Sequence, residues 1–323
     1  MILPCYNEEE VIHETAKRLK IKFNHLIKKN NISDQSKIVF VNDGSKDDTW
    51  SIINQLHQED KIFSGLNLSR NCGHQNALLA GLMTVKNLCD FTISMDVDLQ
   101  DDIDAIDEMI DKYNMGSHIV YGVRDNRKAD TGFKRNTATL YYKILKSFGS
   151  DSIPNHADFR LMSQRALNGL AEFKEVNLFL RGLVPMIGYE SDIVYYKRSK
   201  RFAGESKYPF KKMLAFAIEG ITSLSVKPLK LISRVGIISF ALSIIFAIYF
   251  IIQHFLGQTI SGWSSTIVSI WAIGGLQLLA LGIIGEYIGK IFLETKERPR
   301  YIIQDFLNEK QTPLLGDDEQ SKS

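Results

Sequence analysis

The chain is poor in cysteine and nearly balanced in charge, and both shortages exclude classes of protein. Its 323 residues include three cysteines, Cys5, Cys72 and Cys89, an odd number without metal-ligand spacing. A disulfide framework is therefore not expected, and the three side chains are interpreted as small core residues in a reducing compartment. The formal net charge is +2. It implies no general affinity for polyanions, so nucleic acid is not an expected partner.

Charged residues are missing altogether from one long stretch near the C-terminus. Residues 235–285 contain no Asp, Glu, Lys or Arg. The segments 235–256 and 263–288 are each long enough to cross a hydrocarbon core of about 30 Å as a helix, which predicts a transmembrane hairpin. Basic residues flank the pair and are absent from the connection at 257–262. The positive-inside rule then places both ends in the cytoplasm. A buried hairpin in a large soluble domain is the alternative.

The first two hundred residues alternate apolar, β-prone runs with amphipathic stretches. Strands are predicted at 1–3, 38–41, 91–95 and 119–123, and helices at 8–29, 47–57, 75–88 and 103–113. This order predicts an α/β fold with a mostly parallel sheet and helices on both faces. Ligands of such folds bind beyond the carboxyl ends of the strands.

Oxygen-bearing side chains follow the predicted strand at 91–95. In an extended chain residues two apart point the same way, so Asp96, Asp98 and Gln100 are expected to share one side. Such ligands suit Mg²⁺ or Mn²⁺, which commonly bridge to the phosphates of a substrate. The alternative is an acidic loop that caps the following helix, because acidic residues continue to position 104.

Four motifs occur in a fixed order along the chain. They are P-C-Y-N-E at 4–8, V-N-D-G-S-x-D-D-T at 41–49, S-R-N-x-G-x-Q-N-A at 69–77 and D-V-D-L-Q at 96–100. Each lies at or just after the C-terminal end of a predicted strand, which favours a nucleotide site. The four motifs and the apolar C-terminal segments together resemble the family 2 glycosyltransferases, in particular the polyprenyl-phosphate branch. One motif alone would be a weak signal, whereas four in order are specific.

The resemblance implies a GT-A-like domain that binds a nucleotide sugar, with a UDP-sugar as the first expectation. The positions that match the nucleotide pocket are Pro4, Tyr6, Glu8, Asp43, Arg70 and Asp96. Asp96, Asp98 and Gln100 match the positions for a metal, Mg²⁺ or Mn²⁺, and for the diphosphate. Asp43 matches an acid that contacts the base, although the segment 42–44 could also be a simple turn. Arg70 either stabilises the diphosphate or ties down its own loop.

Basic residues ahead of the apolar segments match positions that hold the phosphate of a lipid acceptor. One set is Arg124, Arg135 and Thr139, and the other is Arg201, Ser206 and Lys207. Arginine forks fit phosphate oxygens. A generic basic surface attracted to anionic lipids is the alternative.

Asp158 matches an acid near the acceptor and is predicted to be catalytic together with Asp98. It could act as a base, or orient a basic residue or the sugar. A phosphate monoester is already largely dianionic near neutral pH, since its second pKa is about 6, so a strong base is not required. A salt bridge with Arg160 is the structural alternative.

The predicted organisation has four parts. They are a cytoplasmic glycosyltransferase domain at 1–208, a juxtamembrane amphipathic helix at 209–231, a two-helix transmembrane hairpin at 232–291 and a cytoplasmic tail at 292–323. Periodicity alone does not decide whether the amphipathic helix lies on the membrane or packs on the sheet. The expected partners are a nucleotide sugar, polyprenyl phosphate and the lipid bilayer, and a homo-oligomer is left open.

By resemblance, the predicted reaction is inverting transfer of a hexose to polyprenyl phosphate, with UDP-glucose and undecaprenyl phosphate as the first choices. It would supply a lipid-linked sugar for the cell envelope. Another donor, such as a UDP-N-acetylglucosamine, GDP-mannose or UDP-aminoarabinose, is the main alternative. A processive synthase is disfavoured because no Q-x-x-R-W run occurs. A non-catalytic membrane scaffold is the alternative from another class.

Overall fold

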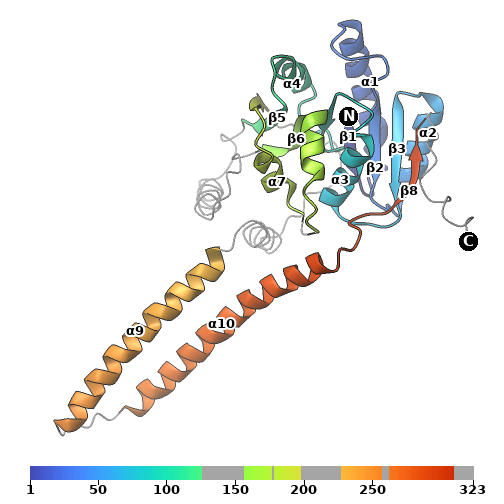
Figure 1. Cartoon of the computed structure of the whole chain (residues 1–323). Coiled ribbons are helices and arrows are strands. Elements are labelled where there is room, and N and C mark those ends of the chain that lie inside the picture. The colour runs from blue at the N-terminus through green and yellow to red at the C-terminus, as the bar shows by residue number, and fades with distance from the viewer. Residues whose placement is uncertain (126–155, 177, 198–226, 257–261, 309–323) are drawn as a thin grey trace, which may run out of the picture.

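An eight-stranded sheet organises the N-terminal domain, from which two long helices project (Figure 1). The computed structural model describes residues 1–125, 156–176, 178–197, 227–256 and 262–308. The strands are β1 (Ile2–Cys5), β2 (Ile38–Asn42), β3 (Phe63–Leu68), β4 (Phe91–Ser94), β5 (Ile119–Arg124), β6 (His156–Ser163), β7 (Ser191–Tyr196) and β8 (Ile303–Leu307). The helices are α1 (Ile12–Lys28), α2 (Thr49–Glu59), α3 (His74–Val85), α4 (Ala105–Asn114), α6 (Gln164–Ala171), α7 (Leu180–Met186), α9 (Lys227–Phe255) and α10 (Trp263–Thr295).

The sheet is mixed rather than mostly parallel. Its order is β7-β5-β6-β4-β1-β2-β3-β8. Within the described residues four strand pairings are parallel, and three are antiparallel, namely β4 with β6, β5 with β6, and β3 with β8. The α/β class is confirmed. The antiparallel strands β6 and β8 come from parts of the chain where the sequence analysis predicted no strand.

Helices cover both faces of the sheet, as predicted. Successive strand residues alternate between two apolar clusters, so that Leu3 packs with α1, α2 and α4 while Ile2 packs with α3, α6 and α7. The predicted strands β1, β2, β4 and β5 and the helices α1 to α4 start and end within a few residues of their predicted bounds, whereas β3 and β7 were not predicted. Continuous apolar runs such as Ile38–Asn42 are buried over their whole length because both faces are covered.

Helices α9 and α10 extend together away from the sheet (Figure 1). Large apolar side chains along them, among them Ile245 and Leu279, are 61% and 63% exposed. Within the described residues one segment, Ile273–Thr295, has the length and hydropathy of a membrane span, and none of it is buried in protein. The helical hairpin is therefore present, whereas crossing of the membrane by both helices stays a prediction.

The chain returns to the sheet after the hairpin. Ile303–Leu307 forms β8, which pairs antiparallel with β3 at the edge of the sheet (Figure 1). The sequence analysis treated this part only as a tail. This pairing brings the chain that follows α10 back to the N-terminal domain.

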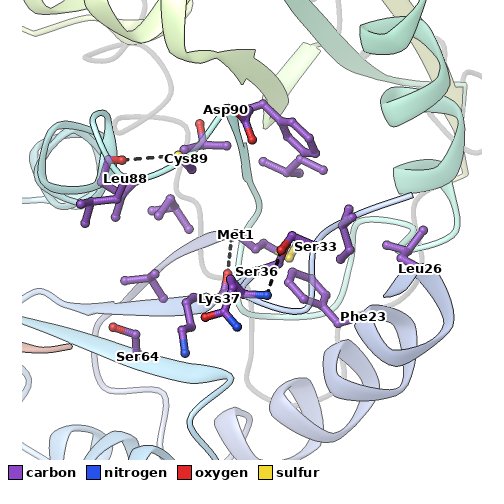
Figure 2. Close-up of a pocket in the computed structure, with 18 of the residues that line it drawn as sticks. Met1, Phe23, Leu26, Ser33, Ser36, Lys37, Ser64, Leu88, Cys89 and Asp90 are labelled. Atoms are coloured by element: carbon purple, nitrogen blue, oxygen red, sulfur yellow. Dashed lines mark hydrogen bonds between the residues drawn. The ribbon is translucent and has the colours of Figure 1, made fainter. Parts of the chain in front are cut away.

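A cavity of about 430 Å³ lies at the amino ends of the strands (Figure 2). Its walls include the start of β1, β2 and β4 and apolar side chains of α1, such as Phe23 and Leu26. β1 pairs with β4 only through Ile2 and Ser94, so the preceding residues of β4 line the cavity. The α-amino group of Met1 donates to the Lys37 carbonyl at 2.6 Å, and burial lowers its pKa to about 6. Ligands of such folds bind at the carboxyl ends of the strands. The cavity is therefore at the opposite edge of the sheet from the candidate site.

Candidate functional site

Carboxylates from two antiparallel strands meet at the carboxyl end of β4. Ser94, the last residue of β4, pairs with Arg160 of β6, so Asp158 lies just beyond the end of β4. Asp96 follows the end of β4 after one residue, Met95. His74, the first residue of α3, bridges the two acids, with its Nε2 3.5 Å from Asp96 Oδ1 and 3.4 Å from Asp158 Oδ2. The site is therefore built where three segments converge.

The segment from Asp96 to Gln100 is a turn and not extended chain, contrary to the sequence analysis. Leu99 has a φ of 57°, and the Gln100 backbone N–H donates to Asp98 Oδ1 at 3.1 Å. This local bond is typical of Asp in turns, where the short side chain competes with regular backbone pairing. Asp98 is buried, whereas Asp96 and Gln100 are partly exposed. Strand alternation therefore does not explain how these three side chains are arranged.

Negative charge is concentrated at this turn. Burial, with the carboxylates of Asp101, Asp158 and Asp98 nearby, raises the pKa of Asp96 to about 6, although His74 opposes the shift. Burial disfavours the cation of His74, yet Asp158 and Asp96 raise its pKa. Among the residues that the structure describes, no three His, Cys, Asp or Glu side chains form a complete metal site.

Asp158 is held between two arginines. Its Oδ1 accepts from Arg160 Nη2 at 2.6 Å and its Oδ2 accepts from Arg181 Nη2 at 3.0 Å. Despite full burial, Arg181, His74 and Arg160 hold the pKa of Asp158 well below its usual range. The predicted salt bridge with Arg160 is present. An ionised, fully engaged carboxylate favours the orienting role over that of a base.

Of the predicted acceptor residues, Arg124 is the one that lies in the described chain. Its Nε donates to the Tyr196 hydroxyl at 3.1 Å, and its Nη2 is 3.5 Å from Asp101 Oδ1. The Tyr196 hydroxyl also donates to Asp101 Oδ1, at 2.5 Å. These contacts fix Arg124 at the end of β5. The other predicted acceptor residues lie outside the described residues, namely Arg135, Thr139, Arg201, Ser206 and Lys207.

The motifs at 41–49 and 69–77 are bonded to each other. The Asp43 carboxylate accepts from the backbone N–H groups of Cys72 at 2.7 Å and Gly73 at 2.9 Å. Gly44 has a φ of +63°, and a Cβ on it would lie 2.6 Å from the backbone of Arg70 and Asn71. Glycine is required there by both conformation and space. Asp43 therefore orders the loop that carries Arg70, which is itself exposed.

The first motif is attached to the same region. The Glu8 backbone N–H donates to Thr49 Oγ1 at 2.9 Å, and the Asn7 N–H donates to Ser45 Oγ at 3.0 Å. Pro4 is buried within β1, while Tyr6 is 41% exposed just beyond it. Tyr6 is thus accessible to a ligand at this edge, and Pro4 is accounted for by its place in the strand.

Two residues of the site, His74 and Arg181, were missed by the sequence analysis. His74 lies inside the motif at 69–77, so its place in that motif was an available signal. Arg181 belongs to no motif, and it reaches Asp158 because α7 packs beside β6. Only the folded arrangement reveals it.

Comparison with known proteins gives consistent matches. Residues 1–170 match the family described as glycosyl transferase family 2, and residues 227–291 match the GtrB C-terminal hairpin. The uncharacterized glycosyltransferase YkoT of Bacillus subtilis is 52% identical over 97% of this chain and 94% of its own length. Bactoprenol glucosyl transferase of Shigella phage SfX is 40% identical over 94% of this chain and 98% of its own length. Glucosyl-3-phosphoglycerate synthase of Mycobacterium tuberculosis matches at 14% identity over 69% of this chain and 77% of its own, with a TM-score of 0.39.

Proposed function

We propose that this chain, which belongs to glycosyl transferase family 2, moves one hexose from a nucleotide sugar to polyprenyl phosphate. The observation that carries the proposal is the concentration of carboxylates at the end of β4, faced by arginines of α7 and β5. An anionic donor diphosphate and an anionic acceptor phosphate both need cationic partners in one place. Relatives named bactoprenol glucosyl transferase support a polyprenyl-phosphate acceptor and favour glucose as the sugar.

Asp96 and Asp98 would hold the divalent cation, Mg²⁺ or Mn²⁺. The fit rests on the donor set, because the carboxylates of Asp96, partly exposed, and Asp98, buried, lie at one turn, and carboxylate oxygens are the ligands that these cations prefer. When bound, the cation would neutralise the charge that develops on the diphosphate leaving group. Gln100 remains a predicted third ligand.

The remaining side chains bind and orient. Asp43 holds the loop of Arg70 against the motif at 41–49, where the base and ribose are proposed to bind. Asp158 keeps Arg181 in place, and Arg124 is fixed by Tyr196 and Asp101. These two arginines, with the predicted set of Arg135, Thr139, Arg201, Ser206 and Lys207, would hold the acceptor phosphate. Its oxygen would attack the anomeric carbon and invert it, as the nucleoside diphosphate leaves.

The proposed location is the cytoplasmic face of the membrane, with α9 and α10 both crossing it. The return of the chain to β8 supports this topology, because only residues 296–302 separate α10 from a strand of the catalytic sheet. The hairpin would then leave and re-enter on the same side. The amphipathic helix at 209–231 belongs to the same proposal, but most of it lies outside the described residues.

UDP-glucose is the proposed donor and undecaprenyl phosphate the proposed acceptor. The direct experiment uses the full chain in nanodiscs with radiolabelled UDP-glucose, UDP-N-acetylglucosamine, GDP-mannose and UDP-aminoarabinose, each with and without polyprenyl phosphate. Transfer of glucose to the lipid fraction is expected, and it should require Mg²⁺ or Mn²⁺. Transfer of another sugar would replace the donor, whereas a lack of any lipid product would overturn the proposed acceptor and favour a non-catalytic scaffold.

A further inference from the structure

The chain that follows the hairpin contacts two parts of the N-terminal domain, the segment before α7 and the end of β3. We call residues 294–307 the C-terminal strap. It runs from the last turn of α10 to the end of β8 and lies along the edge of the catalytic sheet (Figure 1). Apolar side chains of the strap, such as Ile303 and Leu307, pack against the core clusters of the sheet, whereas Gln304 and Asp305 are exposed.

The first part of the strap holds the segment that leads into α7. Glu294 Oε2 accepts from the Val176 backbone N–H at 2.8 Å. Arg300 Nη1 donates to the carbonyls of Phe173 at 3.3 Å and Glu175 at 3.2 Å. These three bonds tie a non-helical stretch to the end of the proposed membrane helix. Shortly after it, α7 begins and carries Arg181, the partner of Asp158.

The second part of the strap reaches the nucleotide side through a relay of side chains. Asp305 Oδ2 accepts from Asn67 Nδ2 at 3.1 Å, and Asn67 Oδ1 accepts from Asn42 Nδ2 at 2.8 Å. Asn42 Oδ1 in turn accepts from the Ser45 backbone N–H at 3.2 Å, which closes the turn around Asp43. Asn42 and Asn67 are both buried, so the bond between their side chains is worth more than it would be in water.

One backbone hydrogen bond and one register shift lie beside this relay. The Ser69 backbone N–H, next to Arg70, donates to the Ile302 carbonyl at 3.0 Å. The pairing of β3 with β8 shifts register between Asn67 and Leu68. Such irregularities re-aim a side chain, and here the shift lies beside the asparagine that joins Asp305 to Asn42.

We infer that the C-terminal strap is a positioning element that couples the membrane hairpin to both substrate sides of the site. The inference rests on the proposed function. Its first part, through Glu294 and Arg300, sets the acceptor side at Arg181. Its second part, through Asp305, sets the donor side at the turn around Asp43. A change in the position of the hairpin in the bilayer would therefore alter the binding of both substrates.

The two parts can be separated by steady-state kinetics of full-length variants in nanodiscs. Arg300→Ala should raise the KM for polyprenyl phosphate about three- to tenfold and change the donor KM less than about twofold, as expected for the loss of one or two hydrogen bonds. Asp305→Ala should raise the donor KM by a similar factor and spare the acceptor KM. Arg300→Lys keeps a hydrogen-bond donor and Asp305→Asn keeps an acceptor, so both variants should have KM values close to those of the wild type. Lys296→Ala and Gln304→Ala are matched, exposed controls on the same strap.

A purely structural role predicts a different outcome. If the alanine variants lower kcat or folded yield alone, with both KM values unchanged, the strap only stabilises the domain and the inference is overturned. Should an alanine variant fail to fold, the milder variants Arg300→Gln and Asp305→Ser carry the same comparison, because their shorter side chains no longer reach the Phe173 and Glu175 carbonyls or Asn67 Nδ2. Amide hydrogen exchange is a readout that does not depend on the proposed function. Faster exchange in 178–186 for Arg300→Ala and in 42–45 for Asp305→Ala is expected even if no lipid product forms, and unchanged exchange in both would overturn the coupling.

Discussion

Gln75 Oε1 accepts a hydrogen bond from the Leu180 backbone N–H at 2.8 Å, which joins the first turn of α3 to the first residue of α7. The two residues are 105 positions apart in the chain. Leu180 precedes Arg181, and its carbonyl lies 3.5 Å from Arg160 Nη1. Gln75 therefore helps to position α7, whose Arg181 forms an ion pair with Asp158.

Gln75→Leu should lower the transfer rate about five- to fiftyfold. The substitution leaves the N–H of a fully buried residue unpaired, which costs about 1–3 kcal/mol of folding stability or forces α7 to move. Gln75→Glu keeps an acceptor at the same place and should retain most activity. Initial rates and urea unfolding of both variants give the comparison. Equal activity of the Leu variant and the wild type would mean that the start of α7 does not matter to the reaction.

Asp158→Ala should unfold the domain before it informs on catalysis. Arg160 is 1% exposed, and the loss of its carboxylate partner leaves a buried, uncompensated charge at a cost of about 3–5 kcal/mol. Asp158→Asn should be destabilised as well, because an amide does not replace the charge. Urea unfolding beside the transfer rate decides the matter. A fully stable Asn variant would mean that the charge of Asp158 is not needed to hold Arg160 in the core.

The pH dependence of Asp158 follows from the direction of its shift. Its pKa is lower in the folded protein than in the unfolded chain, where it is about 3.9. Its contribution to stability is therefore complete above about pH 4 and is lost as the pH falls through the folded value. Between pH 5 and 9 the transfer rate should show no limb caused by Asp158. Acid unfolding of the wild type, followed by circular dichroism from pH 6 to pH 2, tests the stability contribution, and loss of structure above about pH 5 would contradict it.

The sequence predicted the elements whose information is local. Continuous apolar runs identified β1, β2 and β4, and periodic ones identified α1 to α4, because burial on one or both faces leaves a readable pattern. β8 could not be found in this way, since Ile303–Leu307 is half exposed and its strand partner is distant in the chain, with Asn67 lying 238 residues from Asp305.

The candidate site was predictable in its acids and not in their arrangement. Asp96 and Asp158 both lie within 3.5 Å of His74 at the carboxyl end of β4, whereas Asp43 bonds to the backbone of Cys72 and Gly73. The turn at Leu99, however, depends on a bond between Asp98 and the Gln100 N–H that alternation does not foresee. Arg181 has no local signature, because α7 is positioned by Gln75 and Arg160 from distant parts of the chain.

Asp98→Asn should nearly abolish transfer and leave the fold intact. The amide oxygen of Asn can still accept from the Gln100 N–H, so the turn is kept while the charge needed for a divalent cation is lost. EDTA should likewise stop the wild-type reaction, and added Mn²⁺ or Mg²⁺ should restore it. Transfer assays with circular dichroism as the folding control give the answer. Undiminished turnover in EDTA would exclude a metal at this turn.

The topology is testable with fusions to reporters that fluoresce or hydrolyse substrate on one side of the membrane only. Fusions before Lys227 and after Phe306 should both report the cytoplasm, because β8 returns to the catalytic sheet after α10. A tag within 257–262 should report the far side. A C-terminal fusion outside the cytoplasm would mean that one of the two helices does not cross, and that β8 cannot pair with β3 in the membrane-bound protein.

Arg201→Ala should weaken the use of polyprenyl phosphate far more than the binding of the nucleotide sugar. Arg201 lies outside the described residues, within the basic run that leads to the hairpin, and downstream of all four nucleotide motifs. Loss of a charge-assisted contact to phosphate is worth about 1.5–3 kcal/mol, so the apparent acceptor affinity should fall roughly ten- to a hundredfold. High salt should erode a desolvated contact of this kind less than general attraction to anionic lipid. Transfer rate against acceptor concentration, beside donor affinity by calorimetry, separates the two substrates. If donor affinity collapses while the acceptor dependence is unchanged, Arg201 belongs to the diphosphate site, and Arg124 and Arg181 are left as the cations for the acceptor.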